Sequence, residues 1–133
     1  MVLGGALMNY TREDQQEFDR IFKVFGDYLK QSTHVDVVPS KVGYVIIPIE
    51  EGEMSCGVLA EVIETPADLC NLCITEMAHD ILDELAPPRP NLYECSEELK
   101  QRILTRIAPY MKELPEYRYL EEKLFITPHE NWG

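Results

Sequence analysis

The chain has 133 residues, of which 45% are hydrophobic and 27% are charged, and this is the size and composition of one globular domain. Its formal net charge is −12, from 24 acidic and 12 basic residues. This balance disfavours binding to nucleic-acid phosphates or to an anionic membrane, because both need clustered Lys and Arg. No apolar run is long enough to cross a bilayer, so we expect no membrane-spanning helix.

The negative charge is concentrated in the middle of the chain. Residues 50–98 hold thirteen acids and one base, Arg89, whereas residues 1–49 hold six acids and five bases and residues 99–133 hold five acids and six bases. Because two well-defined elements are expected inside the acidic part, it indicates a folded acidic surface and not a disordered acidic tail.

The first expected element is a helix over residues 12–30. Thr11 is a suitable N-cap residue, and Asp14 follows it three residues later. Aromatic and aliphatic side chains then recur at helical spacing, and they are Phe18, Ile21, Phe22, Phe25, Tyr28 and Leu29. The pattern predicts an amphipathic helix with an aromatic buried face.

Three strands are expected next. Residues 34–38 alternate in polarity, residues 42–49 are almost continuously apolar, and residues 56–64 form the third β-rich run. The links between them are short, which predicts an antiparallel meander. Pro48 cannot donate to a ladder, so the second strand either lies at an edge there or ends there.

Three helices are expected in the second half. Thr65, Pro66 and Asp68 are a typical N-cap, N1 and N3, and they start a helix that extends to about Leu85. Its apolar stripe consists of Cys70, Ile74, Met77, Ile81 and Leu85. A proline-rich connector over residues 86–95 then separates it from the next helix.

Ser96 is the expected cap of the following helix. Its buried face consists of Leu99, Ile103, Ile107 and Met111, and we expect it to bend or break near Pro109. Pro115 opens a last helix that carries Tyr117, Leu120 and Leu124.

The order α-β-β-β-α-α-α predicts one α+β domain over residues 1–133. Helices would pack on a small three-stranded antiparallel sheet, and residues 1–10 and 127–133 would be irregular tails.

The cysteines indicate a reducing compartment. Cys56, Cys70, Cys73 and Cys95 lie in a chain whose apolar residues 1–8 are too short, and lack the basic residues, for a secretory signal. We therefore expect a cytoplasmic protein. The Cys70-x-x-Cys73 spacing allows a redox or zinc role, but Cys70 lies about a turn inside its helix and on the apolar stripe, which favours buried structural thiols. We expect no cofactor.

One short motif suggests metal chemistry. Thr75-Glu76-Met77-Ala78-His79 resembles the HExxH helix of zincin metalloproteases, with Thr75 at the position of the first histidine. The resemblance implies a metal ligand at His79 and a general base at Glu76. Since Thr75 is not a usual zinc ligand, it implies a degenerate, metal-binding domain and not a competent protease.

The same helix carries an acidic face, formed by Glu76, Asp80, Asp83 and Glu84. The last three lie near the C-terminal end of the helix, where the macrodipole disfavours anions. Something is expected to neutralise them: Lys100, Arg102 and Arg106 of the following helix, a basic partner or a divalent cation. No catalytic triad order, phosphate loop or nucleophile elbow is present.

These observations favour a non-enzymatic interaction or regulatory module that binds a basic protein. Complementary charge would steer such a partner and raise its rate of association. The alternatives are the metal-binding, zincin-like domain and a small-molecule pocket. A homodimer is a further expectation, from the apolar strand 42–49 and the aromatic residues Tyr117, Tyr119 and Trp132.

Overall fold

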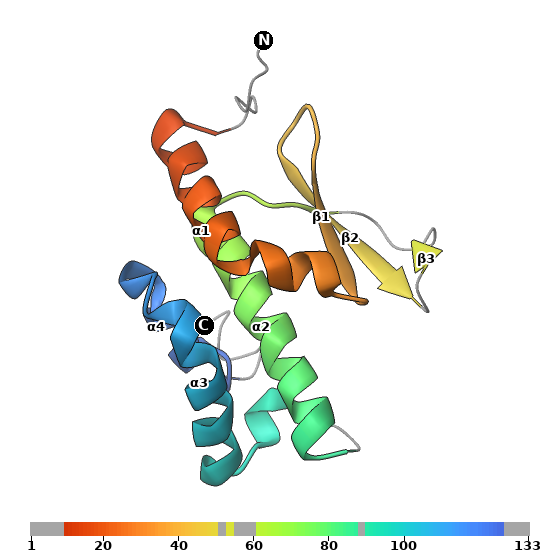
Figure 1. Ribbon diagram of the computed structural model, residues 1–133, viewed down its shortest axis with the longest axis vertical. Coiled ribbons are helices and arrows are strands. Elements are labelled where there is room, and N and C mark those ends of the chain that lie inside the picture. Colours follow the sequence, from red (N-terminus) through yellow and green to blue (C-terminus); the bar gives the residue numbers. More distant parts are fainter. Residues whose placement is uncertain (1–9, 51–52, 55–60, 88–89, 127–133) are drawn as a thin grey trace. The chain divides into compact units, whose positions relative to one another are not determined.

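The computed structural model describes residues 10–50, 53–54, 61–87 and 90–126 (Figure 1). The chain divides inside a helix into two compact units, Met1–Cys70 and Asn71–Gly133. The single-domain prediction is not tested by this division and stays a prediction. Of the two predicted tails, only Tyr10 lies within the described residues.

The predicted α+β class is confirmed, with helices and an antiparallel sheet in the predicted order. In the first unit, helix α1 (Arg12–Gln31) precedes the strands β1 (Val35–Pro39), β2 (Tyr44–Glu50), β3 (Glu53–Met54) and β4 (Glu61–Val62), and α2 (Pro66–Leu85) begins there. In the second unit, α2 continues and is followed by α3 (Glu97–Met111) and α4 (Tyr119–Lys123).

Helix α1 begins at the predicted cap. The Thr11 hydroxyl oxygen accepts a hydrogen bond from the Asp14 amide at 3.0 Å, which satisfies one of the amides that a helix start leaves unpaired. Phe18, Ile21 and Phe25 on the apolar face are fully buried. The predicted amphipathic helix is therefore confirmed, and in the first unit it contacts β1.

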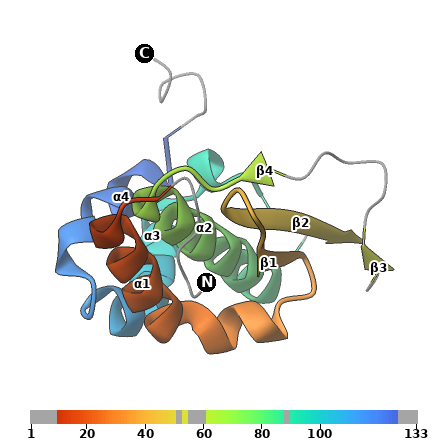
Figure 2. The ribbon, with the colours of Figure 1, turned by 90° about the horizontal axis from the view of Figure 1, so that it is seen from above.

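Strand β2 is the centre of the sheet, as Figure 2 shows. It pairs antiparallel with β1 over Tyr44–Pro48 on one side, and with β4 at Val45 and Ile46 on the other. The short β3 pairs with its far end at Ile49 and Glu50. Of the predicted third strand over residues 56–64, residues 56–60 lie outside the described residues, β4 covers Glu61–Val62, and residues 63 and 64 are not strand.

The Pro48 nitrogen lies where the described part of the sheet needs no ladder hydrogen bond. The Ile49 amide donates to the His34 carbonyl at 2.8 Å on the β1 side, so the Pro48 nitrogen faces the opposite side of β2. There it lies between the residues that pair with β4 and those that pair with β3. In the described part of the chain, the missing amide therefore interrupts no ladder bond.

Four aromatic rings surround the start of β2. The Tyr44 ring lies 5.1 Å from Phe18 and 4.8 Å from Phe22, measured between centroids, and both belong to α1. The Tyr10 ring lies 4.3 Å from Phe18 and 5.8 Å from Tyr44. Tyr10 was expected in an irregular tail, and its ring instead packs in this cluster. Such pairs contribute about 0.5–1.5 kcal/mol each beyond their buried area.

Helix α2 also begins at its predicted cap, since the Thr65 hydroxyl oxygen accepts from the Asp68 amide at 3.2 Å. Of its predicted apolar stripe, Cys70 is buried in the first unit, Ile74, Met77 and Ile81 are buried in the second unit, and Leu85 is half-buried. Among the described residues, no helix has the length and apolar composition that crossing a membrane requires.

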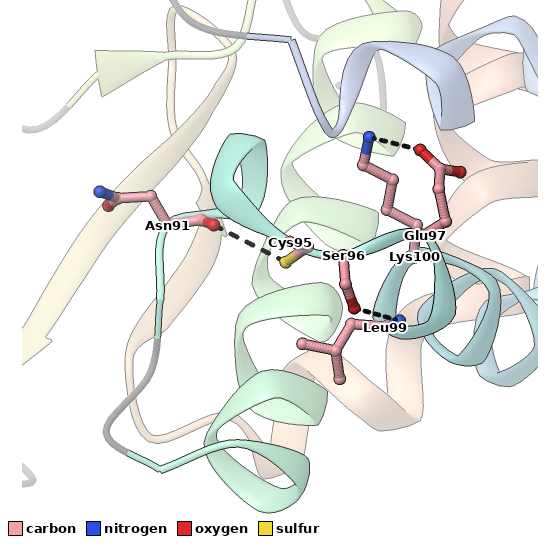
Figure 3. A network of polar contacts seen from close by, with 6 residues as sticks. All are labelled: Asn91, Cys95, Ser96, Glu97, Leu99 and Lys100. Atoms are coloured by element: carbon pink, nitrogen blue, oxygen red, sulfur yellow. Dashed lines mark hydrogen bonds and ion pairs between the residues drawn. The ribbon is translucent and has the colours of Figure 1, made fainter.

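Helix α3 begins at Ser96, whose hydroxyl oxygen accepts from the Leu99 amide at 3.2 Å (Figure 3). A bend or break was predicted near Pro109, and α3 includes this proline and ends two residues after it, at Met111. Proline removes only one amide, and here it stands in the last turn. The predicted last helix starts with a 3-10 turn at Pro115–Tyr117 and becomes α4, with Leu120 and Leu124 buried.

The loop between β1 and β2 requires glycine at position 43. Gly43 has a φ of 144°, and a Cβ there would lie 2.7 Å from the Tyr10 hydroxyl oxygen. We expect Gly43→Ala to lower the free energy of unfolding by at least about 1–3 kcal/mol, the usual range for such a backbone conformation. Urea denaturation measures this loss.

The matched control is Gly26→Ala in α1, where a Cβ meets nothing within 4 Å. Because alanine is the better helix former, this variant should gain about 0.5–1 kcal/mol. A loss at Gly26 as large as that at Gly43 would contradict the assignment.

The aromatic cluster also predicts a loss of stability in alkali. Burial raises the pKa of Tyr10, against the lowering effect of the Tyr44 amide. Burial likewise raises the pKa of Tyr44, and Gln15 lowers it while the Asp19 charge raises it. The folded state therefore holds both protons more tightly than the unfolded state, whose tyrosines titrate near pH 10.

This contribution is complete below about pH 10 and is lost as the pH rises through the folded-state pKa values. We expect the free energy of unfolding to fall more steeply above pH 10 in the wild type than in Tyr44→Phe. Equal slopes in denaturation series from pH 8 to 11 would refute this.

Candidate functional site

The predicted acidic face lies on the second half of α2. Glu76, Asp80 and Glu84 follow one another at helical i, i+4 spacing, and Asp83 is next to them. Glu76 and Asp80 are half-buried, whereas Asp83 and Glu84 are exposed. The last turn of α2 contains no basic residue, so the helix itself supplies no cation to its negative end.

Arg106, a predicted neutralising residue, reaches this face. Arg106 of α3 contacts Glu84 at 2.9 Å between Nη2 and Oε2, and the two side chains are 51% and 60% exposed. Such an exposed pair contributes about 0.2–1 kcal/mol, because solvent screens it and two long side chains are ordered. The acidic face is thus tied to α3 by a weak contact at one end.

Lys100 has its contacts elsewhere. Its ammonium group lies 3.2 Å from Glu97 on the same helix and 5.6 Å from the centre of the Phe125 ring. Arg102 lines an open groove beside the Arg106–Glu84 pair, together with Leu85, Glu98, Gln101, Thr105 and Arg106. Sequence periodicity did not predict this groove, because it forms between two helices.

A second groove lies along α3 and α4 and measures about 730 Å³. Its volume is in the range of small-molecule sites, but it is open to solvent. Its walls carry Lys100 and Arg118 beside Glu97, Glu121 and Glu122. This mixture of charges gives no preference for a ligand of either sign.

The metal hypothesis rests on Glu76 and His79. Both are half-buried on α2, and Thr75 at the position of the absent histidine is half-buried as well. In the residues that the structure describes, neither Glu76 nor His79 belongs to a group of three His, Cys, Asp or Glu ligand atoms close enough to hold an ion. Catalytic zinc needs three protein ligands, so these two residues alone do not form such a site.

The cysteines have the predicted burial. Cys70, Cys73 and Cys95 are buried, and Cys56 lies outside the described residues. The Cys95 thiol donates to the Asn91 carbonyl oxygen at 3.6 Å, as Figure 3 shows. Burial raises the pKa of Cys95, Lys100 lowers it and Glu94 raises it further. A thiol with a raised pKa is less reactive as a nucleophile at neutral pH.

Comparisons of the chain with protein-family models, with curated proteins and with solved structures give no match. The residues of the acidic face are therefore assigned from the charge and geometry of the chain itself.

The Glu84–Arg106 pair can be tested by a double-mutant cycle with Glu84→Gln and Arg106→Gln. We expect a coupling energy of about 0.2–1 kcal/mol at low salt, falling toward zero at high salt, because the pair is exposed. Urea denaturation of the four proteins at two salt concentrations measures it.

Lys100→Gln in the Glu84→Gln background is the control, because Lys100 pairs with Glu97. It should show no coupling to Glu84. A coupling of several kcal/mol for Glu84 and Arg106 would contradict the picture of a weak, exposed contact.

Proposed function

We propose that the protein is a non-enzymatic interaction module whose acidic α2 face binds a basic segment of a partner protein. The observation that carries this proposal is the contact at the end of the face, where exposed Glu84 is held by exposed Arg106 at 2.9 Å. This contact is weak enough to be exchanged for a partner's Lys or Arg without a large loss of stability.

The electrostatics of α2 favour such an exchange. Asp83 and Glu84 lie in the last turn, at the negative end of the helix dipole, and each is disfavoured there by about 0.3–1 kcal/mol. A cation from a partner relieves this repulsion as well as pairing with the carboxylates. Two effects therefore favour a partner's cation at the end of α2: it relieves the repulsion between the carboxylates and the helix dipole, and it pairs with the carboxylates.

The groove beside Glu84 gives the interaction an apolar component. Leu85 lines it, and Glu98 adds a further carboxylate from α3. A basic side chain has an aliphatic stem and a charged head, so it can lay the stem on Leu85 while the head pairs with Glu84 or Glu98. Arg106 would then move away from Glu84, and it is the intramolecular competitor of the partner.

The net charge of −12 supports a role in encounter as well as in binding. A strongly negative protein attracts basic partners over about one Debye length, which is roughly 8–10 Å at physiological salt. The association rate should therefore depend on ionic strength more than the dissociation rate does. A second copy of this chain, the other partner considered, carries the same net charge and would be repelled at long range.

The test is a titration of a short lysine-rich peptide against the wild type and against Asp83→Lys/Glu84→Lys. We expect the double charge reversal to weaken binding by about tenfold or more at low salt, because attraction becomes repulsion at the site. Isothermal titration calorimetry gives the dissociation constant.

The matched control is Asp27→Lys/Asp36→Lys, which reverses two exposed acids on α1 and β1 and changes the net charge by the same amount. Its affinity should stay within about threefold of the wild type, since only the long-range field changes. An equal loss in both double variants would refute a specific face and leave only non-specific attraction by net charge.

A further inference from the structure

The β2–β4 ladder ends on a side-chain hydroxyl. Its register pairs Val45 with Val62 and Ile46 with Glu61, so the next pair is Tyr44 with Ile63. The Ile63 amide donates to the Tyr44 carbonyl at 2.8 Å, which is the first bond expected of a hydrogen-bonded antiparallel pair. The second bond runs through Tyr10.

The Tyr10 hydroxyl takes the place of that second bond. The Tyr44 amide donates to the Tyr10 hydroxyl oxygen at 2.9 Å, and the same hydroxyl donates to the Ile63 carbonyl oxygen. A phenol is both donor and acceptor, so one atom satisfies both backbone groups. Ile63 is 2% exposed, and its carbonyl group would otherwise need a partner inside the protein.

The Tyr10 ring lies in a slot beside Phe18, Tyr44 and Gly43. It packs on Phe18 and stacks on Tyr44, and Gly43 leaves room for its hydroxyl. A Cβ at Gly43 would also lie 3.1 Å from a Val62 methyl group. The slot is thus bounded by side chains from α1, β2 and β4.

The bridge stands at the start of two helices. Tyr10 directly precedes Thr11, the N-cap of α1, and Ile63 lies two residues before Thr65, the N-cap of α2. The two residues that the Tyr10 hydroxyl bridge joins are thus close in sequence to the N-caps of both helices. Within the first unit, this hydroxyl links Tyr10, which precedes α1, to Ile63, which precedes α2.

We propose that Tyr10 is a removable latch in the β2–β4 ladder. With the hydroxyl in place, the pair Tyr44–Ile63 is held open by one oxygen atom. When Tyr10 leaves its slot, the Tyr44 amide bonds directly to the Ile63 carbonyl and β4 lengthens by one pair toward α2. The Tyr44 amide and the Ile63 carbonyl have a hydrogen-bond partner in both states. An event that draws the start of α1 away can therefore shift the equilibrium toward the state in which they bond directly.

Hydrogen exchange at the Tyr44 amide tests the latch, measured by NMR in the wild type, Tyr10→Phe and Tyr10→Ala. Phenylalanine keeps the ring in the slot and removes the oxygen, so the Tyr44 amide should exchange about tenfold faster or more. Alanine empties the slot and lets the direct bond form, so protection should return to within about threefold of the wild type.

Two controls make the comparison specific. Each Tyr44 rate is divided by that of the Phe25 amide in the buried part of α1, which corrects for a change in global stability. Tyr119→Phe removes an exposed hydroxyl and should leave the Tyr44 rate unchanged.

Two results would overturn the proposal. Wild-type protection in Tyr10→Phe would mean that the hydroxyl is not the partner of the Tyr44 amide. Exchange in Tyr10→Ala as fast as in Tyr10→Phe, after the Phe25 correction, would mean that the ladder does not close when the latch is gone.

Discussion

The packing of Tyr44 against three other rings is the interaction on which the first unit depends. Tyr44 opens the central strand β2, and β2 is the strand with which β1, β3 and β4 all pair. Phe18 and Phe22 hold this residue against α1, and the Gln15 side chain donates to its hydroxyl at 2.6 Å. The sheet and the first helix therefore share one anchoring residue.

Much of the fold was predictable because its helices begin at local patterns. Thr11, Thr65 and Ser96 each cap the helix that follows, with contacts of 3.0–3.2 Å to amides three residues later. Each of these contacts joins residues three positions apart in the sequence. The periodic apolar pattern that follows each cap then supports the prediction of a helix. Pro109 shows the limit of the same reasoning, since α3 includes this proline and ends only at Met111, so the residue indicates the end of the helix to within two positions.

The features that escaped prediction join residues distant in the sequence. Tyr10 belongs to no strand or helix, and nothing in residues 1–10 indicates that its hydroxyl completes a ladder between Tyr44 and Ile63. The acidic face was predictable from spacing on one helix. The choice of Arg106, among three basic residues of α3, as the partner of Glu84 was not predictable, because it depends on how two helices face each other.

The proposed binding face and the proposed latch depend on different kinds of interaction. The acidic face depends on exposed charge, which salt weakens and which a partner can compete for. The latch depends on part-buried backbone groups that need a hydrogen-bond partner, and salt has little effect on it. The two proposals can therefore be examined separately in the same protein.

Pro48 has a consequence for the behaviour of the protein at high concentration. Its nitrogen faces the side of β2 that carries only the short pairings with β4 and β3 in the described residues. If these short strands detach, a strand from another molecule that docks there finds a missing donor in the middle of its ladder. The proline is thus an obstacle to the addition of a foreign strand along this side of β2.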